Sequence, residues 1–182
     1  ATAATQANLP LFALPETINL RHIERTALAL LLDRDAASER RVAQLHQQLT
    51  ILSAENAGLA VMAALIGKTT GKTVLIQDKR LNIIATWVAP EMADQKQSIE
   101  SWVTLSENLA EGLRDRKLAA QNQSALVQAM PIGDLERLNV PIIAKSMARG
   151  FLSLVAVHDT IRLFDRSAAE KSAAACALEM AK

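Results

Sequence analysis

The sequence has little cysteine and few aromatic residues. Cys176 is the single cysteine, so the chain can form neither an internal disulfide nor a cluster of thiolate ligands. There is no tyrosine, and three phenylalanines and two tryptophans leave few side chains on which nucleic-acid bases stack. The longest strongly apolar run, Ala27 to Leu32, is too short to span a bilayer, and no signal peptide precedes it. We therefore expect a cytoplasmic protein with no membrane partner.

The sequence also lacks an excess of charge of either sign, because 20 Lys and Arg residues are matched by 19 Asp and Glu residues. This balance argues against nucleic-acid binding as the main role of the chain. The densest basic segment, Arg114 to Lys117, contains its own acid, and we interpret it as a solvated helix face. Hydrophobic residues make up 50% of the sequence, which is enough for a sizeable core.

The segment GKTTGKT, Gly67 to Thr73, is similar to a phosphate-binding loop but differs in spacing and in context. Such a loop needs four residues between its glycines, whereas three separate Gly67 from Gly71. The order is also reversed, because a helix ending near Ile66 leads into a strand starting near Thr73. We interpret Gly67 as the residue that follows the end of the helix.

No other group of residues indicates catalysis or metal binding. The histidines, His22, His46 and His158, lie far apart and have no further ligand at a suitable spacing, so we predict no metal site. Ser153 lies within an apolar strand rather than on a sharp Gly-flanked turn, and Cys176 lies among alanines as a small packed residue. We predict that the chain is not an enzyme and needs no cofactor.

A long segment without Pro or Gly dominates the N-terminal part. From Glu16 to Leu52 nothing interrupts a helix, which predicts one long helix or two joined nearly end to end, after an irregular lead-in over residues 1–15. We divide the chain into residues 1–52, the lead-in and connector helix, and residues 53–182, a second domain. Because the chain begins with Ala1, we expect neighbouring domains. Residues 1–35 are either the tail of an upstream domain of the same kind or share only helical composition with the C-terminal helix.

The second half of this segment has a heptad pattern. One core position holds Val42, Leu49 and Asn56, and the other holds Leu45 and Leu52. The pattern predicts a homodimer in which a buried Asn56 fixes the register, with Ala173 and Ala177 of the C-terminal helix allowing close approach of a second copy. The alternative is a helix packed on its own domain, with Asn56 at a helix break near Gly58.

Short apolar and β-branched segments follow the long helix. The run Phe151 to Val157 is apolar on both faces, so we place it in the middle of a sheet, with a turn near Arg149-Gly150 before it. The predicted fold is of the α/β (α+β) class, with an antiparallel sheet of about five to six strands. Strands are predicted at residues 73–78, 81–87, 125–132, 137–147 and 149–159, and a closing helix at 165–182.

The segment from about Ser53 to Lys182 resembles a GAF domain. Val140, Pro141 and Ile142, then Gly150 and the apolar run Phe151 to Val157, match a strand–turn–strand pattern that this family often carries before its last helix. More narrowly, TGKTVLIQDKRLNIIA and the C-terminal segment resemble PucR-like transcriptional regulators. One departure is Asp78-Lys79-Arg80, where many relatives place a glycine, so we expect a different turn there.

The resemblance implies a sensory module controlling a helix-turn-helix DNA-binding domain outside this sequence. It implies no particular ligand, and a small-molecule effector is a candidate partner. It places a pocket between the sheet and the helical insert, where Trp87, Trp102, Met130 and Ser153 are candidate ligand contacts. Trp87 and Met130 are alternatively core residues, Trp102 an anchor of the insert, and Ser153 a strand filler. The cyclic-nucleotide motif and a chromophore-attaching cysteine in the insert are absent. The alternative function is a purely structural dimerisation module without a ligand.

Overall fold

The computed structural model describes residues 19–122 and 125–182, and the predicted lead-in at residues 1–15 lies outside them. The chain divides into two compact units, Ala1–Ser38 and Glu39–Lys182. The boundary predicted after residue 52 therefore falls inside the second unit. Among the described helices, none combines the length and the hydrophobicity that crossing a membrane requires.

The long N-terminal segment forms one continuous helix, α2 (Leu20–Ala54), that passes from the first unit into the second. In the first unit, Leu28, Leu30 and Leu31 are exposed. The second unit begins with the C-terminal part of α2 and continues through the remaining elements. Its other helices are α3 (Leu59–Thr70), η1 (Pro90–Gln95), α4 (Lys96–Val103), η2 (Ser106–Asn108), α5 (Glu111–Arg114), α6 (Arg116–Asn122) and α7 (Leu163–Glu179).

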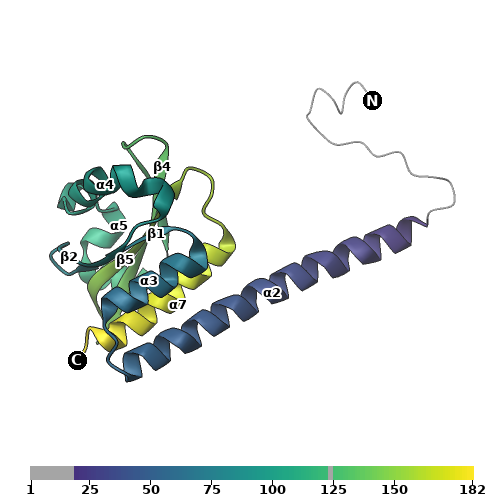
Figure 1. The fold of residues 1–182 in the computed structure, drawn as a ribbon, viewed down its shortest axis with the longest axis horizontal. Helices are drawn as coiled ribbons and strands as arrows, with labels where there is room; N and C mark the ends of the chain where they lie inside the picture. Colours follow the sequence, from purple (N-terminus) through teal and green to yellow (C-terminus); the bar gives the residue numbers. More distant parts are fainter. Residues whose placement is uncertain (1–18, 123–124) are drawn as a thin grey trace. The chain divides into compact units, whose positions relative to one another are not determined.

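A five-stranded sheet forms the centre of this second unit (Figure 1). The strand order is β2-β1-β5-β4-β3, and every neighbouring pair is antiparallel. The predicted α+β class and antiparallel sheet are confirmed, and the apolar run Phe151 to Val157 lies in the central strand. The strands are β1 (Thr73–Asp78), β2 (Ile83–Trp87), β3 (Leu126–Met130), β4 (Leu135–Ala144) and β5 (Met147–Val157).

The turn between β4 and β5 was predicted in the wrong place. It lies at Lys145 and Ser146, between the paired residues Ala144 and Met147, and not near Arg149-Gly150. Both turn residues have positive φ angles, 53° and 60°, as two-residue hairpins of the type that matches strand twist require. Gly150 instead lies within β5, where an added Cβ would be 2.1 Å from the carbonyl oxygen of Gln77.

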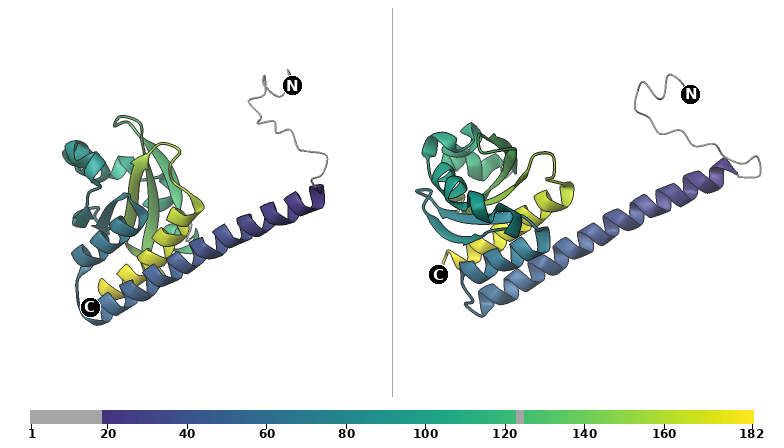
Figure 2. Two further views of the ribbon diagram at one scale, coloured as in Figure 1. Left: turned by 45° about the vertical axis from the view of Figure 1, so that its right-hand side comes forward. Right: turned by 45° about the horizontal axis from the view of Figure 1, so that its top comes forward.

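The two faces of the sheet are covered by different elements (Figure 2). Helices α3 and α7 pack on one face together with the C-terminal part of α2, and we call this the helix face. The segment from η1 to α6 covers the opposite face, the insert face. Because side chains alternate along a strand, Leu152 and Leu154 of β5 join the core of the helix face, while Phe151 and Val155 join clusters on the insert face.

The heptad pattern of α2 is used within the chain. Val42, Leu45 and Leu49 are buried in the core of the helix face, and Leu52 packs against that core. The predicted role of these residues in a dimer interface is therefore wrong for this surface, because the domain's own sheet and helices already cover the apolar stripe. Ala173 and Ala177 of α7 are buried in the same core. Homodimerisation itself stays a prediction.

Asn56 ends the helical segment instead of specifying a partner. It follows α2 with a φ angle of 56°, and its Oδ1 atom accepts a hydrogen bond from Lys182 Nζ at 2.8 Å. The alternative of a helix break near Gly58 is thus the observed arrangement. The next helix also ends later than predicted: Gly71, with φ 71°, is the left-handed residue after α3, and Gly67 lies inside α3. GKTTGKT still runs from helix into strand, the reverse of a phosphate loop.

Candidate anion-binding site

A group of four buried polar side chains lies on the insert face of the sheet. Gln77 comes from β1, Arg137 and Asn139 from β4, and Ser153 from β5. None of the four exposes any surface to solvent. The register explains their proximity, because Ser153 pairs with Asn139 on one side and with Leu75 on the other, so that inward-facing residues of three adjacent strands meet.

Hydrogen bonds join these four side chains into one network. Arg137 donates from Nε to Ser153 Oγ at 3.0 Å and from Nη2 to Gln77 Oε1 at 2.6 Å. Ser153 Oγ in turn donates to Asn139 Oδ1 at 2.9 Å. The amide nitrogen of Gln77 donates to the carbonyl oxygens of Leu81 and Val103 at 2.7 and 3.0 Å. Since Val103 ends α4, the network ties the sheet to the insert.

Arg137 carries a buried positive charge without an anionic partner. No Asp or Glu of the described residues forms an ion pair with it. Burial lowers the pKa of Arg137, because the charged guanidinium loses its hydration. Its Nη1 atom and the Nδ2 atom of Asn139 are both buried and have no hydrogen-bond acceptor among the described residues. Both unused donors belong to side chains of β4 on the insert face, and carboxylates are among the anions that such N–H groups bind.

Apolar side chains flank the polar network on both sides. One cluster contains Met92, Ile99 and Val103 of the insert together with Leu75 and Val155 of the sheet. The other contains Leu109 and Leu113 of the insert with Leu81 and Phe151. A ligand that reached Arg137 would therefore combine an acidic group with an apolar environment, in which charge-assisted hydrogen bonds are stronger than in water.

The predicted ligand contacts are distributed over both faces. Ser153 belongs to the polar network, and Trp102 and Met130 lie in the apolar cluster beside it. Trp87 lies apart, because it packs against the core of the helix face, and an added Cβ on Gly67 would be 2.0 Å from its ring. Arg137, the residue with the clearest chemical role, was missed. The alternation of Arg137 and Asn139 with Leu138 and Val140, in a strand next to the central one, is the signal that points to them.

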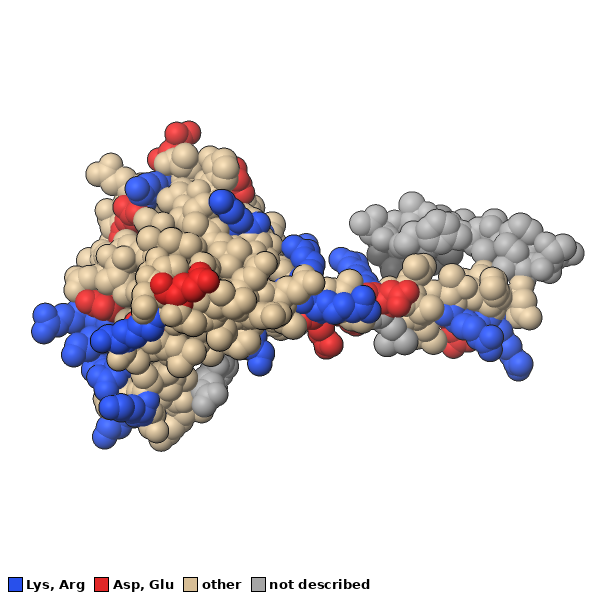
Figure 3. Space-filling view, turned by 60° about the horizontal axis from the view of Figure 1, so that its bottom comes forward, with Lys and Arg blue, Asp and Glu red and all other residues tan. Residues whose placement is uncertain are grey.

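Basic side chains border two surface hollows of about 450 and 540 Å³, and no member of the polar network lines either of them. Lys79 and Arg80, in the β1–β2 turn, line both hollows. Figure 3 shows Lys and Arg side chains gathered on the surface of the domain. The other cationic side chains are Arg114 and Arg116 in the first hollow and Lys145 and Arg149 in the second.

The interpretation of Arg114 to Lys117 as a solvated helix face is therefore only partly right. Arg114 donates to the carbonyl oxygens of Leu109 and Glu107, and Arg116 donates to that of Ala148 at 2.8 Å. Arg114 therefore braces its own loop, whereas Arg116 connects the insert to β5, and both guanidinium groups line the first hollow.

The β1–β2 turn is shaped by Asp78, which stands near the position where many GAF domains have glycine. Its Oδ1 accepts the backbone N–H groups of Arg80 and Asn82 at 2.7 and 2.9 Å, and its Oδ2 accepts Asn82 Nδ2 at 2.9 Å. Partial burial raises the pKa of Asp78, but these hydrogen bonds outweigh it and the net pKa is lowered. Leu81 completes the turn with a φ angle of 67°.

Comparisons with known proteins identify the fold. The sequence matches no protein-family model and no curated protein. Among solved structures, the chain is similar to the GAF domain of a candidate sensor histidine kinase from Pseudomonas syringae pv. tomato, with a TM-score of 0.54 and 14% identity, covering 85% of this chain and 92% of that one. It is also similar to the NLH2 GAF domain of A. aeolicus in an inactive state, with a TM-score of 0.51 and 7% identity, covering 79% and 98%. The fold is therefore GAF-like.

Proposed function

We propose that this chain is the sensory domain of a regulatory protein and that its effector is a small organic acid bound at Arg137. The observation that carries the proposal is a fully buried guanidinium that has, among the described residues, no anionic partner and no acceptor for its Nη1 atom. Removing a charged side chain from water costs several kcal/mol unless a partner compensates. A carboxylate would supply that partner, and its two oxygens can accept hydrogen bonds from the unused donors of Arg137 and Asn139.

The same network gives a route from ligand binding to a change in the domain. Gln77 bonds both to Arg137 and to the carbonyl oxygen of Val103 at the end of α4. An anion that redirects the Arg137 guanidinium changes the bond to Gln77, and through Gln77 the contact with the insert. Signalling requires that the effector bind one arrangement of the insert more tightly than the other.

We further propose, from the resemblance to PucR-like regulators, that this response reaches a helix-turn-helix domain outside this sequence. The lack of a positive charge excess in this chain agrees with the proposal, because the helix-turn-helix domain, and not this chain, would bind DNA. Electrophoretic mobility of DNA from the regulated promoter, with the full-length parent protein and with or without the acid, tests this part separately.

The effector proposal is tested by thermal unfolding in the presence of small carboxylic acids and their uncharged amides. An acid that binds only the folded state raises the melting temperature, since a concentration of 100 times Kd stabilises by about 2.7 kcal/mol. We expect at least one acid to do so while its amide does not. Arg137→Met should abolish the shift. Arg40→Met, which removes the same charge from the exposed side of α2, should leave it unchanged.

Two results would contradict the effector proposal. One is a shift that acid and amide produce equally, which would mean that the carboxylate is not recognised. The other is an unchanged acid response in Arg137→Met, which would place the acid elsewhere.

A structural dimerisation module is the second candidate function, and one feature of the N-terminal unit favours it. Leu28, Leu30 and Leu31 of α2 are exposed, although large aliphatic side chains are usually buried. If α2 pairs with a second copy through this part, Leu28→Glu together with Leu31→Glu should convert dimers to monomers in sedimentation velocity. If the wild-type chain sediments as a monomer at every concentration, this candidate fails.

A further inference from the structure

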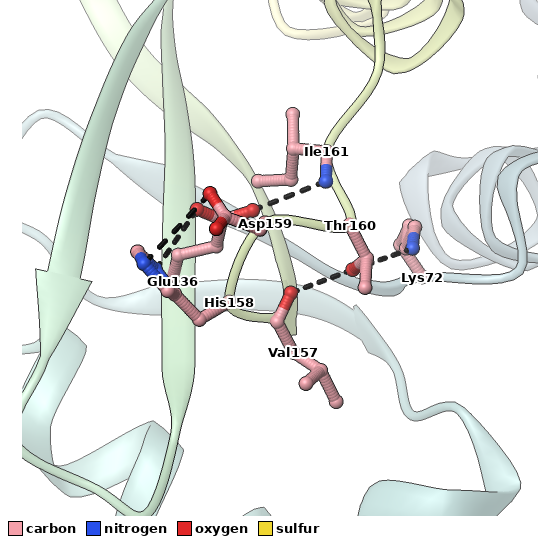
Figure 4. A network of polar contacts seen from close by, with 7 residues as sticks. All are labelled: Lys72, Glu136, Val157, His158, Asp159, Thr160 and Ile161. Atoms are coloured by element: carbon pink, nitrogen blue, oxygen red, sulfur yellow. Dashed lines mark hydrogen bonds and ion pairs between the residues drawn. The ribbon is translucent and has the colours of Figure 1, made fainter. Parts of the chain in front are cut away.

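A second cluster of polar side chains lies at the start of β4, near the segment in which β5 leads into α7 (Figure 4). Glu136 of β4 is next to Arg137 in sequence, so its side chain points to the opposite face, and it is only 5% exposed. His158 and Asp159 follow the end of β5. The three residues are brought together because the antiparallel pairing of β4 and β5 places the start of one strand beside the end of the other.

The imidazole of His158 lies close to both carboxylates (Figure 4). Nδ1 is 3.5 Å from Glu136 Oε2, and Nε2 is 3.8 Å from Asp159 Oδ1. One ligand-type atom from each of the three residues can be chosen so that all lie within 4.8 Å of one another. Two ligands about 2.1 Å from a tetrahedral zinc ion are about 3.4 Å apart. The separation of Glu136 and His158 is therefore close to what a shared ion requires.

Surrounding hydrogen bonds hold this cluster in position. The backbone N–H of Ile161 donates to Glu136 Oε1 at 3.1 Å, which leaves Oε2 directed toward His158. The backbone N–H of His158 donates to the carbonyl oxygen of Asp134 at 2.9 Å. Thr160 donates to the carbonyl oxygen of Val157 and accepts a bond from Lys72 Nζ. Metal ligands in proteins are typically oriented by such neighbouring hydrogen bonds.

The buried carboxylate of Glu136 lacks a permanent cationic partner. Within the described part of the chain, no Lys or Arg forms an ion pair with it, and the nearby imidazole of His158 carries a charge only when it is protonated. Asp159 is different, since its side chain is 92% exposed and free to turn toward an ion. A divalent cation would neutralise Glu136 and draw the three side chains together.

We infer that Glu136, His158 and Asp159 form a binding site for a divalent transition-metal ion of the zinc type. One imidazole and two carboxylates provide three protein ligands, and water completes the coordination. The imidazole nitrogen selects against Mg²⁺ and Ca²⁺, which prefer oxygen ligands. The spacing of residues along the sequence does not indicate this site, because Glu136 lies in β4 whereas His158 follows the end of β5.

Calorimetric titration of the chain with ZnCl₂ tests the inference. We expect one Zn²⁺ ion per chain, and an excess of Mg²⁺ should not displace it. His158→Gln and Asp159→Asn should each weaken binding at least about tenfold. Both positions are solvent-exposed to a degree that leaves folding intact. His22→Gln, which removes an exposed histidine from the N-terminal unit, should bind Zn²⁺ as the wild type does.

Nitrogen NMR of the imidazole rings provides an independent readout, because the chain has three histidines. Zn²⁺ should shift the His158 signals and leave those of His22 and His46 unchanged. In Glu136→Gln, the amide oxygen still accepts the N–H of Ile161, so a loss of Zn²⁺ affinity would reflect the missing carboxylate. Equal affinity in wild type and His158→Gln, or a loss of affinity in His22→Gln as large as in His158→Gln, would overturn the inference.

Discussion

The two faces of the sheet differ in the side chains that the same strands place on them: one face is apolar, and the other includes a polar network. On the helix face, Leu152 and Leu154 of β5 pack in a continuous apolar core with α2, α3 and α7. On the insert face, Ser153 lies between those two leucines in sequence and joins a polar network that separates two smaller apolar clusters. The first arrangement stabilises the domain, and the second places unused hydrogen-bond donors inside it.

The polar network on the insert face is energetically unfavourable compared with the apolar core on the helix face, because it buries a charged group. Burying apolar surface contributes about 25 cal/mol per Å², so each residue of the helix face adds to stability. A buried guanidinium without an anion is unfavourable in the unliganded domain. In the function that we propose, the effector would compensate for this unfavourable charge at Arg137.

The largest effect is expected on the helix face. Leu49→Glu places a carboxylate in the centre of the core, where Leu49 is fully buried, and should destabilise the domain by about 4 kcal/mol or more. The neighbouring change Ile51→Glu, at a position that is 49% exposed, should alter stability by less than about 0.5 kcal/mol. Urea unfolding measures both. A folded, stable Leu49→Glu monomer would mean that the heptad stripe faces another chain after all.

Gly67→Ala should have the next largest effect. An added Cβ would be 2.0 Å from the ring of Trp87, so the ring or α3 must move, at a cost of about 1–3 kcal/mol. Gly112→Ala on the insert side is the matched control, because its Cβ would be an ordinary 3.5 Å from Leu126 Cδ1. Tryptophan fluorescence should shift in the first variant and not in the second. Equal stability of the two variants would contradict the packing of Trp87 on α3.

Arg137→Met should change stability less than a core substitution does. The variant loses two side-chain hydrogen bonds but no longer buries a charge, so we expect a stability within about 1 kcal/mol of the wild type, or above it. Urea unfolding without ligand measures the change, and Arg40→Met on the exposed side of α2 is again the control. A loss comparable to that in Leu49→Glu would show that Arg137 serves the fold, and would weaken its assignment to a ligand.

The smallest effect concerns Asp165 at the start of α7. Burial raises the pKa of Asp165. The hydrogen bond from the N–H of Arg162 and the charges of Lys72, Arg162 and Arg41 lower it, but burial outweighs them. Because the folded state holds its proton more tightly, wild-type stability should fall as the pH rises from the unfolded pKa through the higher folded pKa. Asp165→Asn keeps an acceptor for Arg162 and should lack this decline. Unfolding at several pH values, with exposed Asp94→Asn as the control, measures the difference, and parallel curves for wild type and Asp165→Asn would contradict it.

The sequence predicts the sheet well because strands have strong local signals. The β-branched run from Thr73 to Asp78 forms β1 over the same residues, and the two-sided apolar run Phe151 to Val157 lies in the central strand. The β4–β5 turn was misplaced because Lys145 and Ser146 adopt positive φ angles without a glycine to mark them. The sequence predicts the turn at Gly150, but this glycine lies within β5, where the absence of a side chain allows β1 to approach closely.

The candidate site was less predictable, since it depends on pairings between distant segments. Ser153 was identified, but its partners Arg137 and Gln77 come from other strands and become a group only when β1, β5 and β4 are aligned. The heptad pattern of α2 is a second case in which a local pattern does not reveal which distant segment it contacts. Local periodicity identifies an apolar stripe, but a stripe that meets the chain's own sheet is identical in sequence to one that meets a partner.

A crystal structure of the domain with the acid that stabilises it most would test the central claim most directly. We predict that one carboxylate oxygen lies within hydrogen-bonding distance of Arg137 Nη1 and that the other approaches Asn139 Nδ2, beneath the insert. An acid bound on the surface, with the Arg137 guanidinium still bonded only to Ser153 and Gln77, would contradict the account.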